Sequence, residues 1–292
     1  MTALAGTRVV VLGGASGLLG QELVAVLAAE GAAVRALSRR DADVLDQAAL
    51  SRVLREARPG IVCNAVAYTA VDKAEDEPEA AFALNAKLPE RLGRLCGELG
   101  ALLVHYSTDF VFDGAKRSPY LPEDPAAPLS VYGASKLVGE QALLGLGLSE
   151  LLIVRTSWLF GPGRANFVHK ILGLARERGR LAVVDDQTGS PSYTRDLARN
   201  TVELLRKGAR GLLHLANSGA TTWCGLARAA VELAGIGCPV EAVPTSAYPT
   251  RAVRPAYSVL DLGRFREITG FAPRPWREAL RDYVVGDLGL KA

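Results

Sequence analysis

Short apolar runs alternate with helical patterns through the first half of the chain. The apolar runs predict strands over residues 8–12, 33–37, 61–65, 102–107 and 151–157. Helices are expected between them, for example over 20–31 and 89–100. Near-continuous apolar strands that are separated by helices are typical of a parallel sheet with both faces covered. The pattern therefore predicts an α/β fold with a doubly wound parallel sheet.

The segment that joins the first predicted strand to the first helix is rich in glycine. Within VVVLGGASGLLGQEL, three glycines are spaced G-x-x-G-x-x-G. Such glycines allow a tight turn and let the backbone approach a pyrophosphate, which then faces the positive end of the helix. We expect this loop to bind a dinucleotide; the competing interpretation is an ordinary glycine-rich turn. The loop residues expected at the cofactor are Gly14, Ser16, Gly17, Leu18, Leu19 and Gly20.

The end of the second predicted strand is where a dinucleotide-binding sheet distinguishes NAD from NADP. An Asp or Glu there favours NAD, whereas Arg accommodates the 2′-phosphate of NADP. The sequence ALSRRDADVLD places Ser38, Arg39 and Arg40 at this point. We therefore expect NADPH, with NADH as the alternative, and we expect Asp43 and Val44 beside the adenine. The competing interpretation is that the arginines are solvated loop residues.

The character of the sequence changes after about residue 158, where Gly, Pro and Arg become denser, as in FGPGRANF and VPTSAYPTRAVRPAYS. We expect residues 1–158 to form a Rossmann-type NAD(P)-binding domain. Residues 159–292 would form a smaller C-terminal substrate-binding lobe. The apolar run GLLHLA is an exception, because we expect residues 211–217 to return to the sheet of the first domain.

Composition excludes several classes of partner. Apolar residues make up 49% of the chain and charged residues 22%, and the net charge is +3 without a long basic run. We therefore expect neither nucleic acid nor a membrane as a partner. The first residues lack a signal peptide pattern, and the four cysteines have no CxxC spacing, which favours reduced thiols and a cytoplasmic protein. The three histidines lack zinc-site spacing, so no metal site is expected.

Tyr132 and Lys136 stand four residues apart in VYGASKLVGE and would share one helix face. Earlier, HYSTDFVFDG brings Thr108 and Asp109 to the carboxyl edge of the sheet, where open α/β folds bind ligands. A neighbouring ammonium lowers the pKa of a Tyr, which is about 10 when free. We therefore expect Tyr132 to be an acid that Lys136 assists. The competing interpretation is a core Tyr beside a solvated Lys.

Six segments together resemble the dTDP-4-dehydrorhamnose reductases of the extended short-chain dehydrogenase/reductase superfamily, nearly from end to end. They are NAVAYTAVDKAEDEPEAAFALNA, STDFVFDG, YGASK, RTSWLFGPGRANFV, VVDDQTGSP and RPAYSVLD. The resemblance implies NAD(P)H-dependent reduction of the C4 ketone of a dTDP-6-deoxy-hexulose, such as dTDP-4-dehydro-L-rhamnose, for polysaccharide biosynthesis. It implies a dTDP-sugar as the substrate.

The resemblance also implies roles for matching residues. Tyr132 would donate the proton, Thr108 would bind the substrate oxygen, and Lys136 would hold the nicotinamide ribose. Asn85 resembles a structural Asn of this family. Further cofactor contacts would come from Ala67, Tyr68, Thr69, Tyr106, Tyr132 and Lys136. Substrate contacts would come from Thr108, Asp109, Trp158, Asn166, Gln187 and Arg254; for Trp158 a core position and for Arg254 a surface position are the alternatives.

The chain departs from the family at one position. Some members bind Mg²⁺ between subunits through glutamates, and Glu22 matches the first of these. The second is occupied by Arg195 or Asp196. This departure argues against a metal-bridged dimer, and either a monomer or a homodimer remains compatible. The mixed-charge run over 72–77 is expected to be a solvated helix start.

Three other functions compete with the reductase. A 4,6-dehydratase of this superfamily would carry T-D-E where this chain has TDF over 108–110, which argues against it. An epimerase would hold its nicotinamide cofactor tightly. A non-catalytic relative would resemble the regulatory subunit of a methionine adenosyltransferase, but the Thr, Tyr and Lys set is complete.

Overall fold

A computed structural model describes residues 4–38 and 40–290. Its main feature is a parallel sheet of six strands in the order β10-β5-β4-β3-β1-β2. These strands are β1 (Arg8–Leu12), β2 (Ala33–Leu37), β3 (Ile61–Asn64), β4 (Leu102–Thr108), β5 (Leu151–Thr156) and β10 (Gly211–His214). The predicted α/β class with a doubly wound parallel sheet is confirmed.

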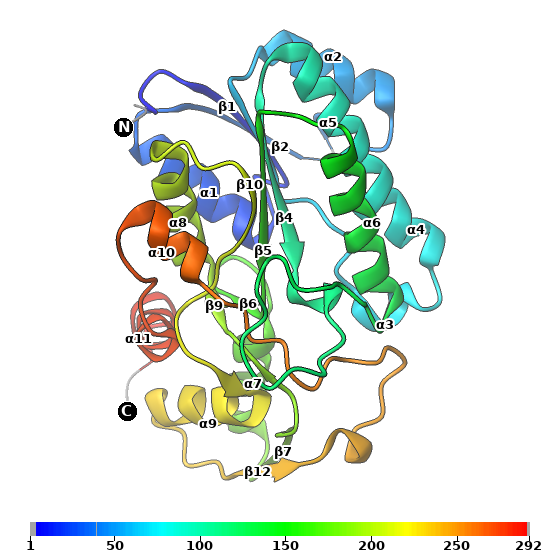
Figure 1. Ribbon diagram of the computed structural model, residues 1–292. Helices are drawn as coiled ribbons and strands as arrows, with labels where there is room; N and C mark the ends of the chain where they lie inside the picture. The colour runs from blue at the N-terminus through cyan, green and yellow to red at the C-terminus, as the bar shows by residue number, and fades with distance from the viewer. Residues whose placement is uncertain (1–3, 39, 291–292) are drawn as a thin grey trace.

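Alternation of side chains along β1 explains why helices cover both faces of the sheet. Val9 and Val11 pack into one apolar cluster, and Val10 and Leu12 pack into another on the opposite face. The first cluster is covered by α1 (Leu18–Ala29), α8 (Thr194–Arg206) and α10 (Gly263–Thr269). The second is covered by α2 (Gln47–Ala57), α5 (Leu88–Leu99) and α6 (Val131–Gly145) (Figure 1).

Helix ends follow local sequence signals. The Asp46 side chain accepts hydrogen bonds from the first turn of α2, and Ser130 caps α6 in the same way. Gly100 ends α5 in the left-handed region at φ 64°. Between β3 and α5 the chain forms α3 (Val71–Ala74), α4 (Pro78–Phe82) and a π-helical turn (Ala83–Lys87), and a 3-10 turn (Asp109–Val111) follows β4.

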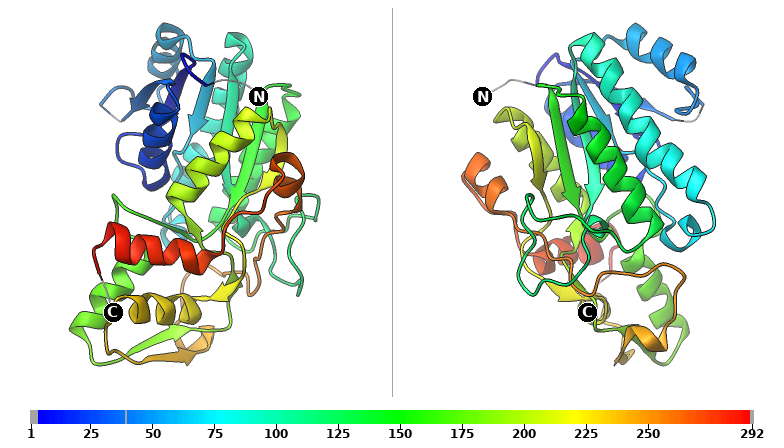
Figure 2. Two further views of the ribbon diagram at one scale, coloured as in Figure 1. Left: turned by 90° about the vertical axis from the view of Figure 1, so that its left-hand side faces the viewer. Right: turned by 45° about the vertical axis from the view of Figure 1, so that its right-hand side comes forward.

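The second lobe lies beyond the carboxyl ends of the strands (Figures 1 and 2). Its helices are α7 (Phe167–Glu177), α9 (Trp223–Leu233), α11 (Trp276–Arg281), a 3-10 turn (Thr245–Ala247) and a π-helical turn (Asp282–Asp287). Its strands form three short pairs: β6 (Leu159–Phe160) with β9 (Ser192–Tyr193), β7 (Leu181–Val184) with β12 (Val240–Val243), and β8 (Thr188–Gly189) with β11 (Thr221–Thr222). Within residues 4–38 and 40–290, no helix has the length and apolar character needed to cross a bilayer.

Candidate active site

A cleft of about 690 Å³ lies between the carboxyl ends of the strands and the second lobe. It includes the point where β2 and β3 lie on opposite sides of β1, which is where open α/β sheets bind ligands. Of the residues predicted from sequence, it is lined by Gly17, Leu18, Leu19, Ala67, Thr69, Tyr106, Thr108, Asp109, Tyr132, Lys136, Trp158, Asn166 and Arg254. The predicted residues outside this lining are Gly14, Ser16, Gly20, Ser38, Asp43, Val44, Tyr68 and Gln187.

The glycine loop has no room for side chains at its turn. A Cβ at Gly17 would lie 2.7 Å from the Gly13 carbonyl oxygen, and one at Gly20 would collide with the same oxygen. A Cβ at Gly14 would lie 2.8 Å from Val24. Gly13 itself has φ 78° and was not singled out from the sequence. The loop therefore brings backbone, without side chains, to the start of α1.

The end of β2 carries a carboxylate, Asp41, that was not among the predicted site residues. Asp41 accepts hydrogen bonds from the Ser38 amide at 2.8 Å and the Ser38 hydroxyl at 2.7 Å, and these bonds lower its pKa. Arg39 lies outside the described residues, and Arg40 is exposed. Asp43 accepts from the Leu45 amide at 2.9 Å. Val44 packs against the apolar cluster of the α2 face.

Tyr132, Thr108 and Asp109 meet at the carboxyl end of β4. Burial raises the pKa of Tyr132 to about 12, hydrogen bonding to Thr108 lowers it, and the charge of Asp109 raises it. The Asp109 carboxyl is itself buried, and burial raises its pKa to about 6. It accepts hydrogen bonds from Ser258 at 2.5 Å and from Thr108 at 3.1 Å. Asp109 thus links β4 to the second lobe.

Lys136 is 1% exposed and is held by groups other than Tyr132. Its Nζ donates to the Tyr106 carbonyl at 2.6 Å and lies 3.3 Å from His105 Nε2. Burial lowers the pKa of Lys136 to about 8, against the charge of Glu140, which raises it. Burial sets the direction of the Tyr132 pKa shift, and the expected assistance of Lys136 to Tyr132 stays a prediction.

Residues around the loop after β3 hold one another in place. Asn85, in the π-helical turn, accepts from the Tyr68 amide at 2.9 Å and donates to the Tyr68 carbonyl and to Ser135 on α6, each at 3.0 Å. These bonds fix the segment that carries Ala67 and Thr69. Tyr106 turns its ring away from the cleft, into the cluster between the sheet and α8, where its hydroxyl contacts Thr201.

A stacked pair of indoles forms the far wall of the cleft. Trp158 and Trp223 lie 3.6 Å apart between ring centroids, with 5° between their planes. Trp158 has φ 50°, which is unusual for a residue with a side chain. Gln187 lies behind this pair: it accepts from Trp223 Nε1 at 3.2 Å and donates to Thr245 at 2.9 Å. No motif or spacing predicts Trp223, which is distant from Trp158 in the chain.

The loop 161–166 and helix α7 bring positive charge to the cleft. Asn166 caps α7, and its side-chain amide nitrogen donates hydrogen bonds to the Gly161 carbonyl at 2.8 Å and to the Tyr283 hydroxyl at 3.0 Å. Its neighbours Arg164 and Lys170 are exposed and line the cleft, and within the described part of the chain neither has an ion-pair partner. Arg164 lies within the family-like segment RTSWLFGPGRANFV but was not among the predicted site residues.

The segment 250–258 is fastened to α3 across the mouth of the cleft. Arg254 makes two hydrogen bonds to the Asp72 carboxylate, at 3.0 and 2.6 Å, and Arg251 pairs with Asp76. Glu75 accepts from the first amide of α6 at 2.8 Å. The mixed-charge run over 72–77 does lie at a helix start and stays largely in solvent, but its carboxylates also bind other segments, which was not expected.

Glu22 faces a guanidinium. Arg195 Nε lies 3.2 Å from Glu22, and another nitrogen of Arg195 lies 2.9 Å from Asp287. Asp196 instead accepts from Asn217 and Arg274, each at 2.7 Å. Arg195, not Asp196, therefore occupies the position opposite Glu22. In the described ranges, no group of three His, Cys, Asp or Glu side chains is arranged to hold a metal ion.

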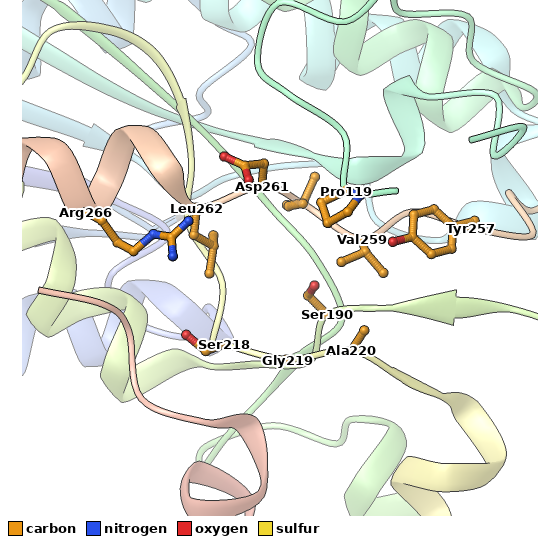
Figure 3. Close-up of a pocket in the computed structure, with 11 residues that line it drawn as sticks. Pro119, Ser190, Ser218, Gly219, Ala220, Tyr257, Val259, Asp261, Leu262 and Arg266 are labelled. Atoms are coloured by element: carbon orange, nitrogen blue, oxygen red, sulfur yellow. The ribbon is translucent and has the colours of Figure 1, made fainter. Parts of the chain in front are cut away.

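A second cavity, of about 350 Å³, opens beside α10 and the segment 257–262 (Figure 3). Asp261 and Arg266 are its only charged lining residues in the described chain. Asp261 accepts from the Gly263 amide at 2.7 Å. Ser190 separates this cavity from the cleft, since its carbonyl accepts from Ser157 at 2.6 Å. None of the residues predicted for the site lines this cavity.

Comparisons with known proteins agree with this geometry. A family profile described as RmlD substrate binding domain matches residues 7–287. The chain is 43% identical over 277 residues to a dTDP-4-dehydrorhamnose reductase of Streptomyces griseus, with 92% of this chain and 90% of the relative covered. It is 40% identical to the spore coat polysaccharide biosynthesis protein SpsK of Bacillus subtilis, with 95% and 97% covered.

Solved structures include a similar fold with a cofactor. The crystal structure of dTDP-4-dehydrorhamnose reductase from Bacillus anthracis in complex with NADP matches with a TM-score of 0.92 and 33% identity, over 96% of this chain and 99% of that one. From these matches over nearly the whole chain, the protein belongs to the RmlD substrate binding domain family.

Proposed function

We propose that this protein is an NAD(P)H-dependent reductase of the C4 ketone of a dTDP-6-deoxy-hexulose, converting dTDP-4-dehydro-L-rhamnose or a close relative. The observation that carries the proposal is that Thr108, Tyr132 and Lys136 line one cleft with the glycine loop. Family membership and the names of its relatives support the substrate class. The product would supply polysaccharide biosynthesis, as the name of the SpsK relative also suggests.

The residues present fit a dinucleotide. The glycine loop forms a cradle that a Cβ at Gly17 or Gly20 would fill, and the open first turn of α1 suits a pyrophosphate. The Ser107 hydroxyl is buried in the cleft without a partner among the described residues, so it is ready to bind a ligand. When bound, the reduced nicotinamide supplies a hydride. Lys136 lies where it can bind the ribose.

Tyr132 is the proposed proton donor. Its raised pKa, about 12, keeps the hydroxyl protonated at neutral pH. Once the carbonyl oxygen gains negative charge, a proton moves to it from Tyr132. The Thr108 hydroxyl hydrogen goes to Asp109 in the structure, so Thr108 would turn this hydrogen from Asp109 to the substrate oxygen to stabilise the negative charge.

The second lobe is proposed to bind the sugar nucleotide. Arg164 and Lys170 bring positive charge that suits a diphosphate, and the stacked Trp158 and Trp223 offer a flat apolar surface to a base or sugar ring. Arg254 is paired with Asp72, so a bond from Arg254 to the diphosphate would compete with this ion pair. Substrate binding would therefore loosen the segment 250–258.

The test measures the consumption of NADPH, from its absorbance, in the presence of dTDP-4-dehydro-L-rhamnose that is generated in situ. The proposal predicts consumption that depends on the ketone, and none with dTDP-glucose, which has the same nucleotide but no ketone. Consumption with neither sugar, by a protein that binds NADPH, would refute the assignment of substrate. Purification with tightly held NAD would favour an epimerase instead.

A further inference from the structure

Both faces of the Trp158 indole are covered inside the protein. On one face Trp223 stacks, with 3.6 Å between the ring centroids and 5° between the planes. On the other face lies the backbone of Gly189, where an added Cβ would be 2.5 Å from Cε2 of Trp158 and 2.7 Å from both Cζ2 and Nε1. Since Cε2 is nearest and its two bonded neighbours are equally far, Gly189 approaches the face of the ring and not its edge.

Gly189 and Trp223 lie on opposite sides of this ring. A Cβ placed between two rings that are 3.6 Å apart would be closer to Trp223 than to Trp158, whereas its three nearest atoms all belong to Trp158. The indole is therefore enclosed between a backbone and a second indole. Both tryptophans line the cleft, so the apolar surface that the pair offers there is made of ring edges.

The backbone of Trp158 is also fixed. It adopts the left-handed region at φ 50°, which costs free energy for a residue with a side chain. The Ser192 amide donates to the Trp158 carbonyl at 3.1 Å. The preceding residue, Ser157, donates from its hydroxyl to the Ser190 carbonyl at 2.6 Å. Strain of this kind persists only where the surroundings hold it, and it is concentrated at ligand sites.

The segment 187–189 holds both indoles. Gln187 Oε1 accepts from Trp223 Nε1 at 3.2 Å. The strand β8 contains Gly189 and pairs with β11, which ends directly before Trp223. We propose that this segment is a positioning element, in which Gln187 holds Trp223 and Gly189 leaves room for Trp158, so that a ligand meets Trp158 only along its edge. The consequence for substrate choice rests on the proposed function, and the enclosure of the indole does not.

The edge of an aromatic ring has different chemistry from its face. The edge carries partial positive charge and the face partial negative charge. An edge-on Trp158 therefore suits an oxygen of the ligand or the face of another ring, and no ring can stack flat on it. Because the indole cannot retreat towards Gly189 or Trp223, a ligand must fit the edge as it stands. Gly189 thus determines specificity without lining the cleft.

Quenching of tryptophan fluorescence by acrylamide tests the enclosure without turnover. The chain has three tryptophans, so Trp223→Phe combined with Trp276→Phe leaves Trp158 alone and keeps a ring against it. We expect a quenching constant about threefold below that of the same variant unfolded in urea, because close packing excludes the quencher from both faces. A folded value equal to the unfolded one would overturn the enclosure, whatever the substrate of the enzyme is.

Gly189→Ala tests the position of the edge. The backbone of Gly189 has no positive φ, so the added methyl acts through its contact with Trp158, which Trp223 prevents from moving away. We expect KM for the sugar nucleotide to rise by about tenfold, more than kcat falls, with NADPH affinity unchanged. Gly179→Ala is the matched control in the second lobe, with open space at its Cβ position. An unchanged KM in Gly189→Ala, or an equal rise in both variants, would overturn the role of Gly189.

A double-mutant cycle separates an effect through the indole from damage to β8. In the Trp158→Ala background the methyl meets the space that the ring has left, so Gly189→Ala should raise KM by less than about twofold. An equal rise in both backgrounds would overturn the proposal, because the methyl would then act without the indole. A wild type that reduces no ketone would refute the proposed function, and the quenching result would still decide whether Trp158 is enclosed.

Discussion

The two walls of the cleft differ in how water reaches them. The sheet wall, formed by Thr108, Asp109, Tyr132 and Lys136, has its ionisable groups buried or half-buried, and burial is the largest cause of each pKa shift there. The lobe wall is formed by Trp158, Arg164, Lys170, Trp223 and Arg254; its cations Arg164 and Lys170 are exposed, and Arg254 is half-buried and paired with Asp72. In the proposed function, proton transfer is assigned to the sheet wall, and recognition of a charged ligand is assigned to the lobe wall.

The Tyr132→Phe substitution gives the largest expected effect. It removes the proposed proton and keeps the ring that packs edge-on against Phe110, 5.6 Å away. We expect kcat to fall by about a thousandfold, the usual contribution of a general acid, with NADPH affinity unchanged. Steady-state kinetics and cofactor titration check both values. Full activity would remove Tyr132 from the chemistry.

A Gly20→Ala substitution tests the cofactor cradle. The added Cβ would collide with the Gly13 carbonyl, so the loop must move. We expect NADPH affinity to fall by about a hundredfold, measured by fluorescence titration. Gly173→Ala is the matched control, since Gly173 is in α7 with open space around its Cβ position. An equal loss in both variants would contradict a specific cradle.

The sheet wall also predicts a dependence of stability on pH. The pKa of Asp109 is raised to about 6 from 3.8 in the folded protein, so this protein binds more protons than the unfolded chain between these values. Stability then falls as pH rises through that window. The Asp109→Asn substitution removes this cost of ionising a buried carboxyl. It should raise the free energy of unfolding by at most about 3 kcal/mol above about pH 7, and by almost nothing below about pH 4.

Thermal unfolding of the protein without cofactor, across that range, measures the effect. Asp113→Asn is a control of opposite sign, because a hydrogen bond from Tyr120 lowers the pKa of Asp113. The Asp113→Asn substitution should lower the free energy of unfolding at neutral pH. This loss should become smaller as the pH falls and Asp113 of the wild type is protonated. A constant difference between Asp109→Asn and the wild type at every pH would show that Asp109 does not titrate as described.

On the lobe wall, Trp223→Ala should separate binding from chemistry. It removes the partner that stacks on Trp158. We expect KM for the sugar nucleotide to rise by about tenfold, with NADPH affinity unchanged. The Trp223→Phe variant should retain most of the stacking on Trp158, and its KM should stay close to that of the wild type. A fall in kcat with an unchanged KM would show that the indole pair acts in the chemical step and not in binding of the sugar nucleotide.

The smallest expected effect concerns the cofactor. Asp41 places a carboxylate beside Ser38, at the end of β2, where an acid favours NAD. Asp41→Ala should therefore increase the preference for NADPH over NADH by about threefold to tenfold. Ratios of kcat/KM for the two cofactors check this. A preference that moves towards NADH would contradict a repulsion between the Asp41 carboxylate and the 2′-phosphate of NADPH.

The sheet wall could be predicted from sequence for a physical reason. Parallel strands end at one edge, so Thr108, Asp109 and the glycine loop meet there once the strands are recognised. Helical spacing then adds Tyr132 and Lys136. The hydrogen bond of Lys136 to the Tyr106 carbonyl could not be predicted, because it depends on how α6 is set against β4.

The lobe wall follows no such periodicity. Trp223 reaches Trp158 through loops, and Gln187 looked like a ligand-binding residue but lies behind the indoles. Arg254 is held by an acidic side chain that had the pattern of a solvated run. These contacts join segments that are distant in the chain, and residue spacing carries no information about them.

The most direct test of the central claim, reduction of the C4 ketone, is the position of hydride transfer. Reduction with NADPH that carries deuterium on its reactive carbon should give a dTDP-6-deoxyhexose with deuterium at C4 alone. Tyr132→Phe should lose this product while still binding NADPH. Deuterium at another carbon, or sugar that is altered at C4 without deuterium, would contradict C4 reduction by the sheet wall.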